Sequence, residues 1–202
     1  MSANRQYGAM LAAATERLRG RDPVEIASRA GIALEGGVYR FETFGRAVKL
    51  DVGSFAAEPA LEMWHHLTVL QYLDSADASR PTDRWIGMDS LADGGMVRGA
   101  SFNREVDAVI AGRLSPLSED ELRRRFEALG AVWASEAQAD LCADFYFMPN
   151  YPYRLSLWLA DDEFPASGKV RVNAGVRRSL GLEAVGTMAV YLVNRVAEGR
   201  GS

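Results

Sequence analysis

The segment 153–165 (YRLSLWLADDEFP) places an alternating strand directly before three consecutive acids, an aromatic residue and a proline. A strand over 153–160 puts its leucines on one face and Trp158 on the other. The adjacent carboxylates of residues 161–163 repel one another, so the turn must face water or hold a positive group. We therefore expect this turn to close one edge of the fold and to rim a pocket.

Asp161 and Glu163 are the candidate ligand-binding acids of this turn. They fall on the same side of an extended chain, where two carboxylates would meet one hard cation or cationic group. A calcium loop needs further oxygen ligands at alternating positions, and the sequence does not continue that pattern. Two other hypotheses stay open: a structural turn in which one acid caps the backbone, or a catalytic carboxylate. Phe164 follows directly and is a candidate contact for the same ligand.

The remaining sequence mixes helical and β patterns without regular β–α alternation. Apolar stripes at helical spacing, with capping signals at Asp22, Ser101 and Ser118, predict helices near 7–18, 22–31, 58–74, 101–113, 118–129 and 185–196. Alternating residues predict strands near 38–43, 48–52, 145–148, 153–160 and 169–173. This order predicts an α+β fold: a single domain over residues 1–202 with a mostly antiparallel sheet of about five strands covered by helices.

Composition limits the classes of function. The 202 residues are 48% hydrophobic and 25% charged, with a formal net charge of −4, which is typical of a soluble globular protein. A general nucleic-acid binder needs a concentrated positive surface to displace counterions, so the acidic balance argues against that class. No apolar run approaches the roughly 18 residues that a membrane span requires, so we expect no membrane association.

Cys142 is the single cysteine of the chain. It cannot form an internal disulfide, and one thiol cannot build a zinc or iron–sulfur site. The expected role is that of a small buried hydrophobe in a reducing cytoplasm. A nucleophilic thiol is the alternative, although no histidine lies near it in the sequence to activate it.

The segment 58–74 carries the longest helical pattern and is apolar around most of its circumference, which is typical of a central helix. Trp64, His65 and Gln71 lie on it as candidate ligand-binding residues. His65 and His66 point about 100° apart, so they cannot chelate one metal ion as an i, i+4 pair would. The first hypothesis for His65 is a satisfied core histidine. Axial ligation of a tetrapyrrole and acid–base chemistry are the alternatives.

The run 157–166 (LWLADDEFPA) resembles the signature of the family catalogued as domain of unknown function 3786 (DUF3786). Asp144, the turn 149–152 and the segment 70–73 (LQYL) support the resemblance, which covers roughly residues 22 to 196. Most of its specificity lies in the Trp-x-x-Asp-x-Glu-Phe-Pro element, because the other pieces are short and common.

The resemblance implies in which organisms and near which metabolic systems such proteins occur, but it assigns no reaction. Members of the family look like proteins of anaerobic bacteria and archaea. Some relatives carry a cysteine-rich, iron–sulfur-type segment and occur near corrinoid-dependent methyl-transfer systems. This chain departs from them, because Cys142 alone holds no such cluster, and because Gln71 stands where a histidine is expected in relatives. The implied link to corrinoids is an association and carries no mechanism.

Three hypotheses follow. The first is a non-catalytic cytoplasmic binding or accessory protein for a tetrapyrrole such as a corrinoid or haem, with Trp64, Trp85 and Trp158 lining its pocket. Its partner would be a small molecule or a corrinoid protein. The second is a small enzyme that uses Asp161 or Glu163, assisted by a divalent metal. The third is a protein-interaction module, which would expose an apolar patch near the acidic turn.

Overall fold

The computed structural model describes residues 3–91, 95–136, 138–176 and 178–199. Two antiparallel sheets and the helices that pack on them make up this part of the chain. The arrangement confirms the predicted α+β class. The sequence predicted one sheet, and the structure divides the strands between two.

The first sheet is a meander. In spatial order its strands are β1 (Ala33–Glu35), β2 (Val38–Thr43), β3 (Arg46–Asp51) and β4 (Ala57–Glu58). Tyr39 of β2 lies opposite Leu50 of β3, and Phe41 lies opposite Val48. All four side chains are buried, so the alternation of this hairpin turns one face toward the core.

The second sheet has five strands and contains the predicted strands near 145–148, 153–160 and 169–173, whereas those near 38–43 and 48–52 belong to the first sheet. In spatial order the five strands are β5 (Trp85–Gly87), β9 (Ser167–Asn173), β8 (Tyr151–Trp158), β7 (Leu141–Met148) and β6 (Val132–Trp133). β8 begins two residues earlier than predicted and includes Pro152. Proline is tolerated there because β9 pairs with β8 only from Tyr153 onward, so the missing N–H interrupts no ladder on that side.

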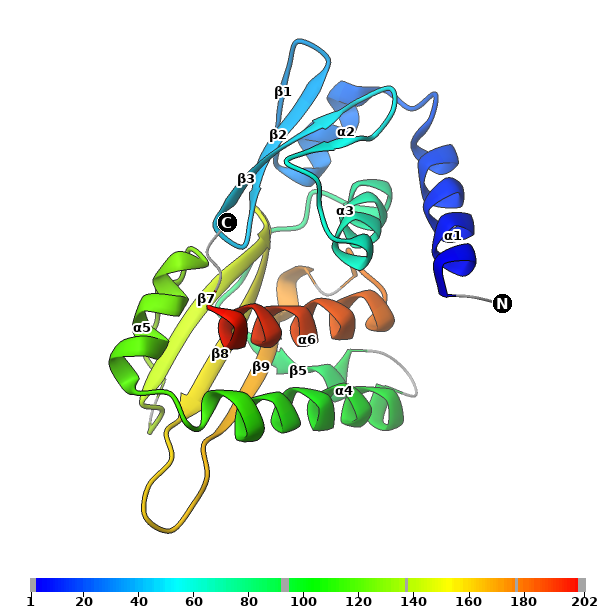
Figure 1. Cartoon of the computed structure of the whole chain (residues 1–202). Coiled ribbons are helices and arrows are strands. Elements are labelled where there is room, and N and C mark those ends of the chain that lie inside the picture. The colour runs from blue at the N-terminus through cyan, green and yellow to red at the C-terminus, as the bar shows by residue number, and fades with distance from the viewer. Residues whose placement is uncertain (1–2, 92–94, 137, 177, 200–202) are drawn as a thin grey trace.

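The helices are α1 (Ala3–Leu18), α2 (Pro23–Ala30), α3 (Met63–Ser75), α4 (Gly95–Val109), α5 (Glu119–Ala128) and α6 (Leu182–Glu198). Figure 1 shows α6 and α4 lying across the same face of the five-stranded sheet, while α3 lies beside α1. Within the described ranges, none of these helices is long and apolar enough to cross a membrane.

Capping signals in the sequence set two helix ends as predicted. Asp22 Oδ1 accepts a hydrogen bond from the Val24 amide at 2.9 Å, and α2 ends at Gly31 with φ of 71°. Ser118 Oγ accepts a hydrogen bond from the Glu121 amide at 3.3 Å at the start of α5. These short-range interactions need no tertiary partner, which explains why the sequence alone predicted them.

Two predicted helix starts are wrong. α3 begins at Met63 instead of residue 58, because residues 57–58 pair with β3 as strand β4. Ser101 lies inside α4, which is already helical at Gly95. Glycines at 95 and 99 weaken the helical pattern in this region, so periodicity placed the start too late.

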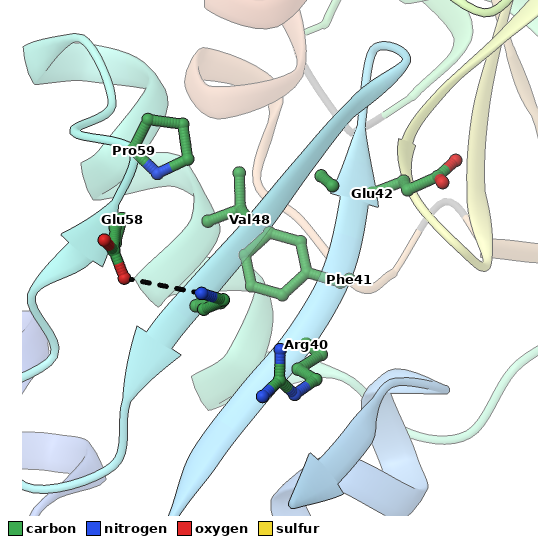
Figure 2. Close-up of a pocket in the computed structure, with 8 residues that line it drawn as sticks. Arg40, Phe41, Glu42, Val48, Glu58 and Pro59 are labelled. Carbon is green, nitrogen blue, oxygen red and sulfur yellow. Dashed lines mark ion pairs between the residues drawn. The ribbon is translucent and has the colours of Figure 1, made fainter.

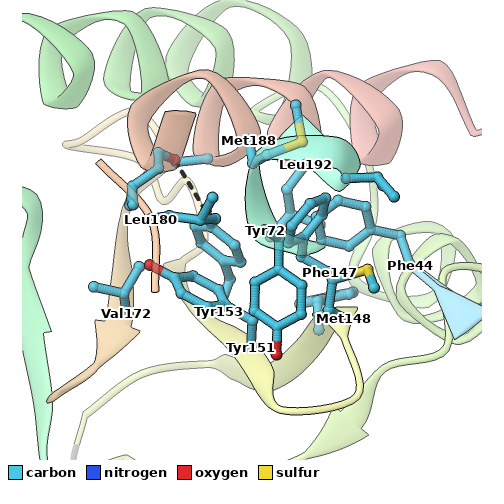
Figure 3. Close-up of a cluster of buried hydrophobic side chains, with 14 of the residues drawn as sticks. Phe44, Tyr72, Phe147, Met148, Tyr151, Tyr153, Val172, Leu180, Met188 and Leu192 are labelled. Atoms are coloured by element: carbon cyan, nitrogen blue, oxygen red, sulfur yellow. Dashed lines mark hydrogen bonds between the residues drawn. The ribbon is translucent and has the colours of Figure 1, made fainter. Parts of the chain in front are cut away.

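A continuous hydrophobic core joins the two sheets. Figure 3 shows its centre, where Phe44 from the β2–β3 hairpin meets Phe147 and Tyr153 of the second sheet beneath Met188 of α6. The centroid of the Phe44 ring lies 6.0 Å from that of Phe147 and 6.2 Å from that of Tyr153. The Tyr153 hydroxyl donates to the carbonyl of Val185 at 3.2 Å and so fixes α6 on the sheet.

The close approach of α6 to α4 at Gly186 gives a test of this packing. A Cβ at position 186 would lie 2.2 Å from the Phe102 ring. Gly186→Ala should therefore lower the free energy of unfolding by about 1–3 kcal/mol, measured by urea denaturation, because the ring must move. Gly8→Ala in α1 is the matched control, since nothing lies within 4 Å of its added Cβ. It should stabilise by roughly 0.5–1 kcal/mol through helix propensity, and equal effects of the two variants would contradict the packing.

Candidate functional site

A groove lies between the start of α3 and the outer side of α6. Its volume is about 420 Å³. Apolar surface comes from Met63, Trp64, Met188, Val190 and Tyr191, and polar groups come from Glu62, His65, Thr187, Asn194, Arg195 and Glu198. Trp64 is 42% exposed, and its ring packs edge-to-face with Tyr7 at a centroid distance of 5.8 Å. Apolar walls with polar groups at fixed positions are typical of small-molecule sites.

His65 forms part of the groove lining and is the most unusual group in it. The side chain is 2% exposed, and its Nε2 lies 2.7 Å from Thr43 Oγ1. Its Nδ1 is buried with no hydrogen-bond partner among the described residues, a feature shared only with the Tyr151 hydroxyl in this part of the chain. Buried polar atoms are nearly always paired, so an unpaired nitrogen beside a groove needs an explanation.

The environment of His65 keeps its imidazole neutral. Burial is the main cause that lowers its pKa from 6.5 to about 3, and the nearby charges of Arg46 and Arg195 act in the same direction. The ring of Tyr191 lies 4.8 Å from the imidazole, centroid to centroid. Burial raises the pKa of the Tyr191 phenol to about 12, so the phenol stays protonated at neutral pH. His65 is therefore fitted to accept or donate a hydrogen bond, and not to carry a charge.

Arg195 is the cation of the groove. Its Nη1 lies 3.7 Å from Glu62 Oε1 and 3.5 Å from Glu198 Oε2, and the side chain is only 15% exposed. The flanking acids make the groove close to neutral at this end. The arrangement offers hydrogen bonds and apolar contact to a ligand, and the described residues of its lining include no nucleophile paired with a base.

The other sequence-predicted aromatic and amide residues lie elsewhere. Trp85 and Trp158 are on the face of the second sheet opposite α6, with the Arg154 guanidinium 4.2 Å from the Trp85 ring and the Lys169 ammonium 5.7 Å from the Trp158 ring. Gln71 is half-buried further along α3 and does not line the groove. Of the predicted ligand-binding residues, Trp64 and His65, which are neighbours in the sequence, are the two that line the groove.

The acidic turn is convex. Figure 1 shows the loop between β8 and β9 projecting beyond the end of the sheet. Asp161 Oδ1 accepts hydrogen bonds from the amides of Glu163 (2.9 Å) and Phe164 (2.7 Å), and these bonds lower the pKa of its carboxyl. Phe164 is 66% exposed. Across the described ranges, no group of three or more His, Cys, Asp or Glu side chains could hold a metal ion.

The sequence did not predict a network of charges on the open face of the second sheet. Arg154 donates to both carboxylate oxygens of Asp144, at 2.7 and 2.9 Å, and Arg171 donates to Glu136 at 2.6 Å. Strand alternation had placed Arg154 on this face, but its partner comes from the neighbouring strand. Within each pair the two charges neutralise one another, which indicates a structural role for these four residues.

Cys142 lies on the same open face, beside Ser156. Its side chain is 5% exposed, and its Sγ lies 3.6 Å from Ser156 Oγ. Burial is the main cause that raises the pKa of the thiol, so the reactive thiolate is disfavoured. This environment supports the first hypothesis for Cys142, a small buried hydrophobe.

A larger cavity, of about 590 Å³, lies against the first sheet (Figure 2). Its lining combines Phe41, Val48 and Pro59 with Arg40, Glu42, Lys49 and Glu58. Lys49 Nζ lies 3.7 Å from Glu58 Oε2, and Arg40 Nε lies 2.9 Å from Glu35 Oε2. Among the described residues, no unpaired buried polar atom lines this cavity, whereas His65 Nδ1 belongs to the lining of the α3–α6 groove, so the groove is the stronger candidate site.

The fold and the groove define an α+β protein with a space for a small molecule between two helices. The chain belongs to the family described as Domain of unknown function (DUF3786), whose sequence model matches residues 22–195. The match confirms the resemblance based on the run 157–166. No curated protein and no solved structure matches the chain.

The neutral state of His65 predicts a dependence of stability on pH. Its folded pKa of about 3 lies below the ordinary value of 6.5, so below pH 6.5 the unfolded chain binds a proton that the folded chain excludes. This contribution is complete above pH 6.5 and is lost on acidification, by up to about 1.4 kcal/mol per pH unit. Chemical denaturation at several pH values between 7 and 4.5 gives the free energy of unfolding as a function of pH. Its decrease on acidification should be shallower for His65→Gln than for the wild type. An unchanged slope would show that His65 titrates normally in the folded chain.

Proposed function

We propose that the chain is a non-catalytic cytoplasmic binding or accessory protein whose ligand, a tetrapyrrole such as a corrinoid or haem, occupies the α3–α6 groove. The observation that carries the proposal is the buried, unpaired Nδ1 of His65 beside an apolar groove with Trp64 open to solvent. A ligand that reaches this nitrogen would remove the cost of an unmade hydrogen bond, which is about 1–3 kcal/mol.

The volume and chemistry of the groove support a mostly apolar small-molecule ligand. Its volume of about 420 Å³ falls in the range of roughly 300–1,000 Å³ found for small-molecule sites. The flat face of Trp64 suits stacking against a planar ring. Arg195 and the protonated phenol of Tyr191 are suited to the carboxylate or amide groups at the edge of a macrocycle.

Axial ligation of a metal is not part of the proposal. The metal lies at the centre of a macrocycle, whereas the imidazole is 2% exposed behind the groove lining with its Nε2 beside Thr43, so His65 does not reach that centre. A polar group at the edge of the ligand would have to extend past the lining to pair with Nδ1. We assign His65 a hydrogen-bonding role instead. The family setting near corrinoid-dependent systems agrees with the ligand class, and a corrinoid protein is the corresponding partner. The lone buried thiol of Cys142 suits a reducing cytoplasm.

The enzyme and interaction hypotheses draw less support from the geometry. The carboxylate of Asp161 accepts hydrogen bonds from amides of its own turn, and Glu163 is exposed on the projecting loop between β8 and β9. Phe164 is exposed but is a single side chain, and scattered exposed apolar residues are ordinary on protein surfaces.

The proposal predicts binding that depends on Trp64. Titration with haemin, cobinamide and cobalamin should shift the absorbance spectrum of at least one of them and retain it on the protein. Trp64→Ala should weaken that binding by tenfold or more, equivalent to about 1.4 kcal/mol. Trp133→Ala is the matched control, since Trp133 is 41% exposed against 42% for Trp64 but lies outside the groove.

Circular dichroism should first confirm that both variants are folded. Absence of any spectral shift or retention with all three compounds would overturn the tetrapyrrole proposal. Equal weakening by the two tryptophan variants would place binding outside the groove.

A further inference from the structure

A second cavity lies beyond the far end of α3, away from the groove. Its volume is about 480 Å³, and it opens between the loop that follows α3 and the 3₁₀ turn η3 (Ala174–Val176). The polar residues of its lining are Asp77, Ser79, Arg84, Ser90 and Arg178. The α3–α6 groove uses the opposite end of α3, so the two spaces are separate.

The charges of this cavity are unbalanced. Neither Arg84 nor Arg178 makes a side-chain hydrogen bond or ion pair with any described residue of the chain. Among the described residues Asp77 is the only acid in the lining, and its Oδ1 already accepts hydrogen bonds from the Ser79 amide at 3.0 Å and from Ser179 Oγ at 3.4 Å. Arg154 and Arg171 of the open sheet face, by contrast, each have an acid partner. Two guanidinium groups therefore face one cavity without a matching anion.

The backbone that carries the arginines is held in place. Asn173 is fully buried; its Oδ1 accepts from the amides of Thr82 (2.8 Å) and Gly175 (3.0 Å), and its Nδ2 donates to the Thr82 carbonyl (2.6 Å). The Ala174 amide donates to the Arg84 carbonyl at 2.8 Å. A Cβ at position 175 would lie 2.4 Å from the Arg80 carbonyl oxygen, so only glycine permits this close approach.

We infer that this cavity binds a small organic oxyanion, with Arg84 and Arg178 as the anion-binding groups. A guanidinium donates two parallel hydrogen bonds to a carboxylate or phosphate. Hydrogen bonds between charged groups are stronger than those between neutral groups. The hydroxyls of Ser79 and Ser90 can donate to further oxygens. Ile86 offers apolar contact to the carbon skeleton of the same molecule. Because the backbone frame is fixed before binding, the ordering entropy that opposes binding comes mainly from the exposed side chains of Arg84 and Arg178.

Calorimetric titration with glycerol 3-phosphate and with citrate tests this site, and the two probes distinguish a phosphate from a polycarboxylate ligand. At low ionic strength at least one probe should bind at a single site. Arg84→Gln and Arg178→Gln should each weaken binding tenfold or more, and the double variant should abolish it. Added sodium chloride should weaken binding further, because exposed charges are screened. Uncharged glycerol should not bind.

Arg104→Gln is the matched control, because Arg104 is an exposed arginine on α4 that lies outside the cavity and has no partner among the described residues. It should leave binding unchanged. Failure of both anions to bind, or equal losses from Arg104→Gln and the cavity variants, would overturn the inference. Trp64→Ala should not affect anion binding, so the test is independent of the tetrapyrrole proposal.

Discussion

The packing of the β2–β3 hairpin against the second sheet is the interaction on which the central core and the environment of His65 depend. The two-residue turn consists of Phe44 and Gly45, with φ of 47° and 74°, the conformation that tight hairpins prefer. A non-glycine residue in this region costs roughly 1–2 kcal/mol. Burial of the Phe44 ring, 3% exposed, offsets that cost, together with a 2.7 Å hydrogen bond from its amide to the Tyr146 carbonyl.

The same junction determines the candidate site. Thr43 directly precedes the turn and holds Nε2 of His65, while the rings of Phe44 and Phe147 lie 5.8 Å from the imidazole. The hairpin thus fixes the imidazole in an environment where it stays neutral, and Nδ1 has no partner among the described residues. The groove itself is lined by residues 62–65 at the start of α3 and by α6, and the hairpin turn acts on it through His65.

This origin explains how much the sequence could predict. Capping at Asp22, strand alternation in 38–43 and the placement of Trp158 opposite the leucines of its strand depend on neighbours a few residues away, and the structure agrees with each. The separation of the strands into two sheets, and the placement of Trp64 and Trp85 in different regions, depend on how elements pack. Local patterns do not contain that information.

The acidic turn and the arginine cavity show the same contrast for charged residues: one is visible in the sequence, and the other depends on how the chain folds. The sequence shows three adjacent carboxylates that should repel one another. In the structure, however, the Asp161 carboxylate accepts hydrogen bonds from the amides of Glu163 and Phe164 within its own turn. Short acidic side chains can do this because backbone donors lie within reach of them. Arg84 and Arg178 gave no signal, since each is one arginine among many. They become informative only when folding brings both to one cavity and, among the described residues, supplies neither with an acid. Charge left unpaired by folding is visible only in the tertiary structure, and the anion-site inference therefore depends on it.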